Sequence, residues 1–250
     1  MRFTDKVCLV TGGASGIGRE TCKRFAAEGG IVVVVDINEA GGNQTVNMIT
    51  ETERQAIFIK ADVSDATDVR ATVNTVVSRF GRIDILVNNA GSLVERLRTL
   101  ELTEARWDEV MNLNATSAFF AAKAVIPKML EKGGGAIINV TSIAGRNGGA
   151  PGSIHYSSAK AALLTMTKGL AKEFANRGIR VNAVSPGVID TPYHVTFTTA
   201  ETMQNLRNTI PMGREGRPEE VAAVIAFLAS DAASYLCGET IEINGGLLMD

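Results

Sequence analysis

The chain has 250 residues, of which 45% are hydrophobic, a content that supports one sizeable core. Its 25 basic and 27 acidic residues leave a net charge of −2, which argues against nucleic acid as a partner. The N-terminus has no charged-then-apolar leader, and no apolar run is long enough to span a bilayer. The sequence therefore predicts a soluble cytoplasmic protein with no membrane partner.

The metal-binding residue types are few. Three cysteines, Cys8, Cys22 and Cys237, are odd in number, far apart and embedded in apolar segments. This pattern favours buried thiols in a reducing compartment over a disulfide or a metal site. With only two histidines, His155 and His194, a histidine-based metal site is not expected.

Strands and helices alternate along the first half of the chain. Continuous apolar runs, typical of strands buried on both faces, occupy residues 7–10, 31–35, 56–59 and 83–87. Helical patterns are expected at about residues 19–28, 39–53 and 66–80. Gly29 and Gly30 end the first of these helices, and Ser64 and Asp65 cap the third.

The alternation continues in the second half. Further strands are expected at residues 136–140, 179–184 and 240–243. A long helix is expected over about residues 103–131, in which Pro127 should kink the last turn or end it early. Later helices should carry Tyr156 and Lys160 to about residue 176, and span residues 218–230. Residues 191–216 have weak periodicity and are interpreted as a mobile excursion with one short helix.

This order predicts an α/β fold: a single-domain, doubly wound, Rossmann-like parallel sheet of about seven strands with helices on both faces. Ligands of such sheets bind at the carboxyl ends of the strands, near the point where the strand order reverses. The residues singled out as candidates for binding or catalysis follow those ends: Gly12, Asp36, Asp62, Asn88, Ser142 and Pro186. A random scatter of polar residues would not do so.

A glycine-rich turn follows the first strand. Residues 11–18, Thr-Gly-Gly-Ala-Ser-Gly-Ile-Gly, have glycines at 12, 16 and 18 and open a helix. Glycines there let the chain turn sharply and let a pyrophosphate approach backbone N–H groups at the positive end of the helix. The spacing Gly-x-x-x-Gly-x-Gly differs from the usual Gly-x-Gly-x-x-Gly fingerprint, and an ordinary turn is the alternative.

Asp36, at the end of the second strand, argues against an ordinary turn and indicates the cofactor. A carboxylate there can accept hydrogen bonds from both adenosine ribose hydroxyls and would repel a 2′-phosphate. Ala14, Ile37 and Asn38 offer no positive charge to pair with such a phosphate. The sequence therefore predicts NAD(H) rather than NADP(H).

Tyr156 and Lys160 are four residues apart in a predicted helix and so share one face. A lysine cation favours the neighbouring phenolate and should lower the pKa of the tyrosine, which makes a general acid/base for neutral pH. Taken alone, the pair is more typical of a half-buried tyrosine beside a solvated lysine than of a catalytic site. The other motifs argue for the catalytic interpretation.

Together these motifs resemble the short-chain dehydrogenase/reductase family in its compact single-domain form, over essentially the whole chain. The resemblance rests on Thr-Gly-x-x-x-Gly-x-Gly at 11–18, Asn-Asn-Ala-Gly at 88–91, a variant of Asn-x-Ser at 140–142, Tyr-x-x-x-Lys at 156–160 and Pro-Gly at 186–187. It implies an oxidoreductase that moves a hydride between a nicotinamide and an alcohol or ketone carbon. No metal is implied.

The resemblance also implies residue roles. Tyr156 would donate or accept the proton, Lys160 would hold the nicotinamide ribose, and Ser142 would bond the substrate oxygen. Asn114 would help to hold a water in a proton relay; Asn112 is its rival, but the register set by residues 107–110 favours Asn114. The implied cofactor contacts are Gly12, Ser15, Gly16, Ile17, Gly18, Asp36, Ile37, Asp62, Val63, Asn89, Ala90, Gly91, Tyr156, Lys160, Pro186, Gly187, Val188 and Thr191.

Substrate contacts are expected from residues 92–98, 143–154 and 186–216. Their polar side chains favour a small polar substrate such as a polyol, sugar or hydroxy acid, although steroids and other hydrophobic alcohols stay possible. The side chains in and beside these segments are Glu95, Arg96, Arg146, Asn147, His155, Tyr193 and His194, of which His155 is expected to be structural.

Two other functions stay open. The family's 3-oxoacyl-[acyl-carrier-protein] reductases typically use NADPH and a basic docking patch; Arg177 fits one patch position, whereas residues 132–135 lack the arginine often found there. A non-catalytic NAD-binding regulator would be marked by loss of Tyr156 or Lys160, and both are present. Helices 103–131 and 156–176, with residues 245–246, resemble the family's interfaces and predict a homo-oligomer, a tetramer or a dimer.

Overall fold

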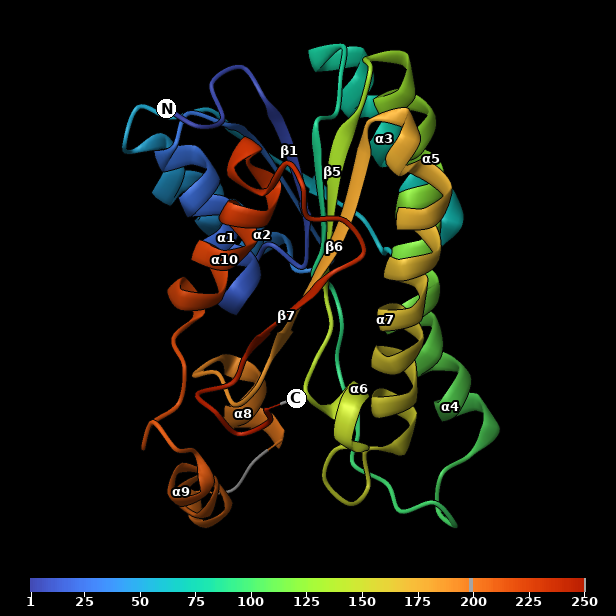
Figure 1. Ribbon diagram of the computed structural model, residues 1–250, viewed down its shortest axis with the longest axis vertical. Helices are drawn as coiled ribbons and strands as arrows, with labels where there is room; N and C mark the ends of the chain where they lie inside the picture. Colours follow the sequence, from blue (N-terminus) through green and yellow to red (C-terminus); the bar gives the residue numbers. More distant parts are fainter. Residues whose placement is uncertain (198–199, 250) are drawn as a thin grey trace.

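The computed structural model describes residues 1–197 and 200–249, with the backbone alone at 193–195 and 200 (Figure 1). Seven strands form one parallel sheet in the order β3-β2-β1-β4-β5-β6-β7. Their bounds are β1 (Val7–Thr11), β2 (Ile31–Asp36), β3 (Ala56–Lys60), β4 (Ile85–Asn88), β5 (Gly135–Val140), β6 (Ile179–Pro186) and β7 (Thr240–Ile243). The predicted doubly wound α/β fold is confirmed, and the strand order reverses between β1 and β4.

Helices cover both faces of the sheet (Figure 1). One face carries α1 (Gly16–Ala27), α2 (Glu39–Thr50) and α10 (Pro218–Ala229); the other carries α3 (Ala66–Phe80), α5 (Ser117–Glu131) and α7 (Ile154–Phe174). The apolar runs of the strands serve both layers, because successive side chains point to opposite faces. In β1, Cys8 and Val10 join the core under α1, whereas Val7 and Leu9 join the core under α3.

The long helix predicted over residues 103–131 is divided. It consists of α4 (Glu104–Met111), a π-helical turn (Asn112–Thr116) and α5. Thr103 caps α4, since its hydroxyl accepts the N–H of Arg106 at 3.2 Å. Pro127 lies inside α5, which continues to Glu131, so the expectation of an early end is wrong. A proline costs the helix one N–H donor but does not end it where tertiary packing holds both sides.

The excursion contains two helices, α8 (Pro192–Phe197) and α9 (Ala200–Thr209), where the sequence predicted one. Each is too short to establish a hydrophobic period, which explains the error. The base of the excursion is closed, because Gly216 N donates to Val188 O at 3.0 Å and Asp190 N donates to Gly216 O at 2.9 Å. Residues 198–199 of this predicted segment lie outside the described residues.

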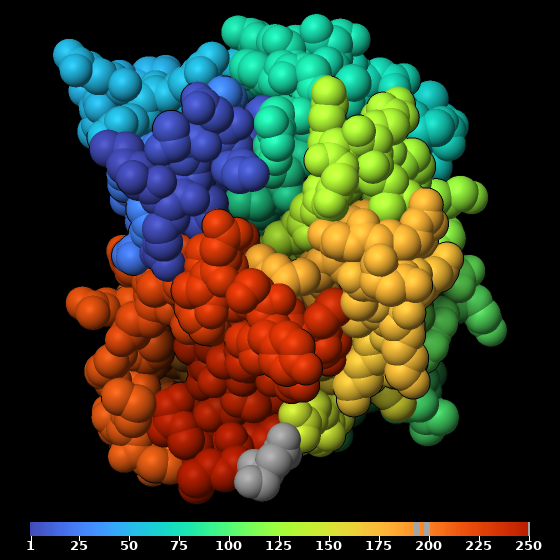
Figure 2. All heavy atoms as spheres, turned by 45° about the horizontal axis from the view of Figure 1, so that its top comes forward, coloured from blue at the N-terminus to red at the C-terminus, as the bar shows by residue number. Residues whose placement is uncertain are grey.

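Short turns complete the chain. One-turn α6 (Ala144–Asn147) lies in the glycine-rich loop after β5, and 3-10 turns occupy Ala175–Arg177 and Asp231–Ala233. The segment after β7 lies against the excursion, where Met212 N donates to Gly245 O at 3.1 Å; Figure 2 shows these red and orange regions side by side.

Cys8 and Cys22 are buried, Cys237 is partly buried, and all three are unpaired. Burial raises the pKa of the Cys8 and Cys22 thiols, which makes them unreactive. Among the described residues, no helix has the length and apolar content needed to cross a bilayer. The same residues contain no group of three or more side chains able to hold a metal ion.

Candidate active site

A cleft of about 1190 Å³ opens at the carboxyl ends of the strands. Most of the residues predicted as site residues line it, from segments far apart in the sequence: Gly12, Ser15, Gly16, Ile17, Asp36, Ile37, Asp62, Val63, Asn89, Ala90, Gly91, Ser142, Tyr156, Lys160, Pro186, Gly187, Val188 and Thr191. Gly18 and Asn114 do not line the cleft and support residues that do.

The glycine-rich turn forms a tight cradle before α1. Gly12 has φ +65°, and a Cβ there would lie 2.7 Å from Asn89 Nδ2. Asn89 Nδ2 donates to the carbonyl oxygens of Thr11 and Gly12, each at 3.0 Å. A Cβ on Gly18 would lie 2.0 Å from Gly12 O, so this glycine permits close packing of the turn on the helix. The backbone N–H groups at the start of α1, which have no acceptor within the helix, then border the cleft. Such groups suit the binding of an anionic pyrophosphate.

Asp36 is fixed at the end of β2. Its Oδ2 accepts the Ala14 N–H at 3.0 Å and its Oδ1 accepts the Asn38 N–H at 2.9 Å. An ionised carboxylate has further acceptor positions, and these remain for a ligand in the cleft. The nearby Arg19 is not a lining residue, since its guanidinium donates to Ala14 O and to Thr45 Oγ1 within the α1–α2 layer.

The turn after β3 borders the same end of the cleft. Asp62 Oδ1 accepts from Ser64 twice, from the N–H at 2.9 Å and from the hydroxyl at 2.6 Å. Asn112 Nδ2 donates to Ser64 O at 3.3 Å, so Asn112 belongs with this turn. The structure therefore separates Asn112 from the lysine and places Asn114 beside it.

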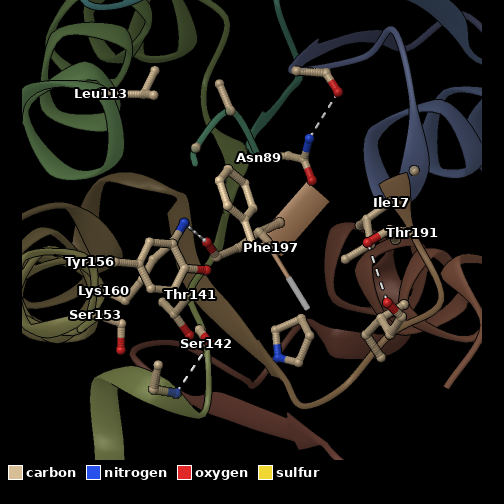
Figure 3. Close-up of a pocket in the computed structure, with 18 of the residues that line it drawn as sticks. Ile17, Asn89, Leu113, Thr141, Ser142, Ser153, Tyr156, Lys160, Thr191 and Phe197 are labelled. Carbon is tan, nitrogen blue, oxygen red and sulfur yellow. Dashed lines mark hydrogen bonds between the residues drawn. The ribbon is translucent and has the colours of Figure 1, made fainter. Parts of the chain in front are cut away.

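Lys160 is buried beside Tyr156 on α7. The lysine is 3% exposed, its Nζ donates to Val140 O at 2.9 Å, and Nζ lies 5.6 Å from the centroid of the Tyr156 ring. Burial lowers the pKa of Lys160 to about 8. Figure 3 shows Tyr156, Ser142 and Ser153 grouped on one side of the cleft, with Ile17 and Thr191 on the other.

Asn114 lies in the π-helical turn and is 1% exposed. Its Nδ2 donates to Ser92 O at 2.8 Å and to Val110 O at 2.9 Å, while its buried Oδ1 has no hydrogen-bond partner among the described residues. A Cβ on Gly91 would lie 2.5 Å from that oxygen and 3.0 Å from Lys160 Nζ. The orphaned acceptor and the lysine thus border one point, which suits a bridging water.

Ser142 follows β5 and lines the cleft. Its Oγ accepts the Ala144 N–H at 3.1 Å, which starts α6 and leaves the hydroxyl proton for another partner (Figure 3). The preceding Thr141 donates its hydroxyl to Val184 O at 2.7 Å. Hydrogen bonds on both sides of Ser142 therefore fix the end of β5.

Only part of the predicted substrate-side set lines the cleft. Arg96 and Asn147 do. Three others do not and serve neighbouring elements: Glu95 pairs with Arg106 at 3.1 Å, Arg146 pairs with Glu242 at 2.9 Å, and His155 is fully buried with Nε2 3.0 Å from Glu95 O. The side chains of Tyr193 and His194 lie outside the described residues.

Some lining residues were not anticipated from the sequence. Leu113 enters from the π-helical turn, and Leu247 enters from the segment after β7. Leu247 follows a strand end, the same signal that identified Ser142, but residues 245–246 were assigned to an oligomer contact. Leu113 adjoins Asn114, and no pattern in the sequence indicates its direction.

The parallel sheet, the glycine cradle and the Tyr156–Lys160 pair define a class of dinucleotide-binding oxidoreductases. A family model described as Enoyl-(Acyl carrier protein) reductase matches residues 12–248. The chain belongs to the short-chain dehydrogenase/reductase family, as the motifs predicted. Members of this family bind a nicotinamide dinucleotide and small-molecule substrates.

Three relatives illustrate the range of similarity. The chain is 42% identical to the 3-oxoacyl-[acyl-carrier-protein] reductase FabG of Thermotoga maritima, over the full length of both. It is 39% identical to the cis-4-hydroxycyclohexanecarboxylate dehydrogenase of Sinomonas cyclohexanicum, over 98% of this chain and 97% of that one. The crystal structure of levodione reductase matches with a TM-score of 0.94 at 36% identity, over 98% of each chain.

Proposed function

We propose that the protein is an NAD(H)-dependent oxidoreductase that interconverts a secondary alcohol and a ketone, and that residues 1–250 act as one dinucleotide-binding catalytic domain. The observation that carries the proposal is one shared cleft. Tyr156 and Ser142 line the same cleft as the glycine cradle and Asp36, with Lys160 buried beside the tyrosine.

The proposed roles follow from the chemistry of each group. The nicotinamide, when bound, supplies or accepts the hydride. The glycine cradle and the start of α1 hold the pyrophosphate, and Asp36 accepts from the adenosine ribose hydroxyls. Tyr156 takes or returns the proton at the substrate oxygen, and Ser142 donates a hydrogen bond to that oxygen.

Lys160 and Asn114 support the proton transfer. A lysine ammonium beside Tyr156 stabilises the phenolate that forms when the tyrosine gives up its proton. With a pKa of about 8, Lys160 carries this charge at neutral pH. The orphaned Asn114 Oδ1 next to Lys160 Nζ provides the acceptor for a water through which the proton can leave the cleft.

NAD(H) is favoured over NADP(H) by the surroundings of Asp36. Its two oxygens are held by backbone N–H groups, and Arg19 is tied to Ala14 O and Thr45. Lys60, the register neighbour of Asp36 on β3, is paired with Glu39. A 2′-phosphate placed beside this carboxylate would meet repulsion with no compensating charge.

A small secondary alcohol with a polar group is the proposed substrate class. The substrate end of the cleft combines polar Ser153, Asn147 and Arg96 with apolar Phe197 and Leu206. The hydroxycyclohexanecarboxylate named for the Sinomonas relative is a molecule of this class.

A second candidate is a 3-oxoacyl-[acyl-carrier-protein] reductase. The 42% identity to the Thermotoga maritima enzyme over its full length supports it. Asp36 argues against it, because that activity is typically NADPH-dependent in this family.

A substrate and cofactor screen tests these candidates. NAD and NADP reduction would be followed with polyols, sugars, hydroxy acids and secondary alcohols, and acetoacetyl thioesters would be reduced in the reverse direction. We expect turnover of a small polar alcohol with NAD, at least about tenfold above NADP. Turnover restricted to thioesters with NADPH would support the second candidate, and tight NADH binding without turnover would support a non-catalytic regulator.

The proposal extends to a cytoplasmic homo-oligomer, a tetramer or a dimer. Phe119 on α5 and Ile154 on α7 are each 44% exposed, which leaves apolar surface on the two helices whose counterparts form the family's dimer interface. Sedimentation equilibrium would measure the assembly, and a monomer at micromolar concentration would contradict it.

A further inference from the structure

The loop that follows β4 is held in one position by side chains from other elements. Asn114 Nδ2 donates to Ser92 O at 2.8 Å, and His155 Nε2 donates to Glu95 O at 3.0 Å. The Glu95 carboxylate pairs with Arg106 of α4 at 3.1 Å. These contacts fix the loop between the π-helical turn, α4 and the start of α7.

The loop also contains strained backbone. Val94 has φ +63°, a left-handed conformation that is an outlier for a β-branched residue. Such strain costs on the order of 1–3 kcal/mol and persists only where surrounding contacts determine it. The loop is thus built to hold the residues after Val94 in one place, and Arg96 is the one that lines the cleft.

Arg96 keeps donors and its full charge for a ligand. Its Nη1 donates to Pro151 O at 3.2 Å and its Nη2 to Phe197 O at 3.4 Å. A guanidinium has five N–H donors, so three remain. No carboxylate of the described residues forms an ion pair with Arg96. A planar cation that is exposed, oriented and not neutralised suits bidentate binding of a carboxylate.

The acidic residues that line the cleft do not neutralise the positive charge of Arg96. Asp36 and Asp62 follow β2 and β3 at one edge of the sheet. Glu109 is paired with Arg106 at 2.5 Å. Arg96 instead contacts Pro151, in the segment between Ser142 and Tyr156. No carboxylate that lines the described part of the cleft therefore neutralises the charge of Arg96.

We propose that Arg96 binds a carboxylate on the substrate, so that the enzyme interconverts a hydroxy acid and the corresponding oxo acid. This inference rests on the proposed function. In the oxidation the carbinol C–H bond breaks, its hydride passes to bound NAD, the hydroxyl proton passes to Tyr156 and a C=O bond forms. The carboxylate does not change in the reaction, so Arg96 should act mainly on KM.

The test compares three hydroxy acids with their methyl esters: 3-hydroxybutyrate, 3-hydroxycyclohexanecarboxylate and 4-hydroxycyclohexanecarboxylate. Arg96→Gln should lower the acid-to-ester ratio of kcat/KM by about 10- to 100-fold, mainly through KM. Arg96→Lys should give an intermediate ratio. The matched control is Arg98→Gln, which removes an equal charge from an exposed residue of the same loop that does not line the cleft. It should leave the ratio within about twofold.

A second readout separates charge recognition from loop structure. Rising ionic strength should raise KM for the acids and not for the esters. Equal kcat/KM for acid and ester in the wild type, or an acid preference retained in Arg96→Gln, would overturn the inference while leaving the proposed function intact. Equal loss for acids and esters in Arg96→Gln would also overturn it, as Arg96 would then only support Phe197. Inactivity of the wild type toward all acids and esters, with turnover of polyols, sugars or other secondary alcohols, would overturn this inference alone. Inactivity toward every alcohol of the screen, with either cofactor, would overturn the proposed function and this inference together.

Discussion

The two ends of the cleft are built in different ways. The cofactor end consists mainly of short turns directly after strands, in which residues close in sequence bond one another: Asp36 accepts the Asn38 N–H, and Asp62 accepts the Ser64 N–H. The substrate end is assembled from distant segments: Arg96 contacts Pro151 and Phe197, which are 55 and 101 residues away. Local motifs therefore indicate the cofactor, whereas substrate contacts depend on long-range packing that a motif does not encode.

The variant Tyr156→Phe should distinguish the roles of the two ends of the cleft most clearly. It removes the proposed proton donor and leaves the cofactor end unchanged, so kcat should fall by about 10²–10⁴-fold while the NADH dissociation constant stays within about twofold. Steady-state kinetics and NADH fluorescence titration measure the two effects. Tyr235→Phe, at a fully exposed tyrosine, is the control and should have neither effect. Residual activity above a tenth of the wild type would refute the assignment.

Gly18→Ala should damage the cofactor end instead. The added Cβ would lie 2.0 Å from Gly12 O, so the turn and α1 must separate. We expect a loss of about 3 kcal/mol in the free energy of unfolding, measured in urea, with weaker NADH binding. Gly169→Ala, in α7 with no atom within 4 Å of the new Cβ, should stabilise the protein by about 0.5–1 kcal/mol. Equal stability of the two variants would contradict the packing argument.

Asp36→Ala tests whether the carboxylate at the end of β2 determines the preference for NAD over NADP. Removing the carboxylate removes both the ribose acceptor and the repulsion of a 2′-phosphate, so the NAD-to-NADP ratio of kcat/KM should fall by about tenfold. Glu39→Ala changes the charge equally at an exposed residue that pairs with Lys60, and should leave the ratio unchanged. A wild type that already prefers NADP would show that the ribose argument is wrong.

Lys160 lies where the two ends meet, and its burial should appear in the pH dependence of stability. Its folded-state pKa of about 8 lies below the ordinary value of 10.5, so above pH 8 the unfolded state binds more protons. Stability therefore rises with pH in this window, by about 1 kcal/mol between pH 7 and 9 relative to Lys160→Met. Urea unfolding at pH 7, 8 and 9 measures this difference, and a constant difference would contradict the assignment.

The fold was predictable because each strand is an apolar run between helical patterns, and the errors have local causes. Two short helices in the excursion lack a hydrophobic period, and α6 is a single turn in a glycine-rich loop. The π-helical turn leaves no compositional sign, since Asn112, Leu113 and Asn114 suit an ordinary helix equally well.

The candidate site was predictable where a residue type is needed at a strand end, as for Asp36 and Ser142. It was less so where burial decides. Lys160 looks like a surface lysine in sequence, yet it is 3% exposed with a lowered pKa. Gly18 is predicted as a cofactor contact from its motif, whereas its close packing against Gly12 is visible only in the structure. No pattern in the sequence predicts the contact between Arg96 and Phe197.

The π-helical turn has a further consequence for how the chain tolerates insertions and deletions. An α-helix advances about 100° per residue, and a π-helical turn holds one residue more than an α-helical turn. The wide turn absorbs that residue, so α5 keeps the apolar face of Ala121, Val125 and Met129 toward the sheet. Deleting Ala115 should therefore give an ordinary helical turn and leave this face in place, whereas inserting one residue between Ser117 and Ala121 should rotate the face by about 100°.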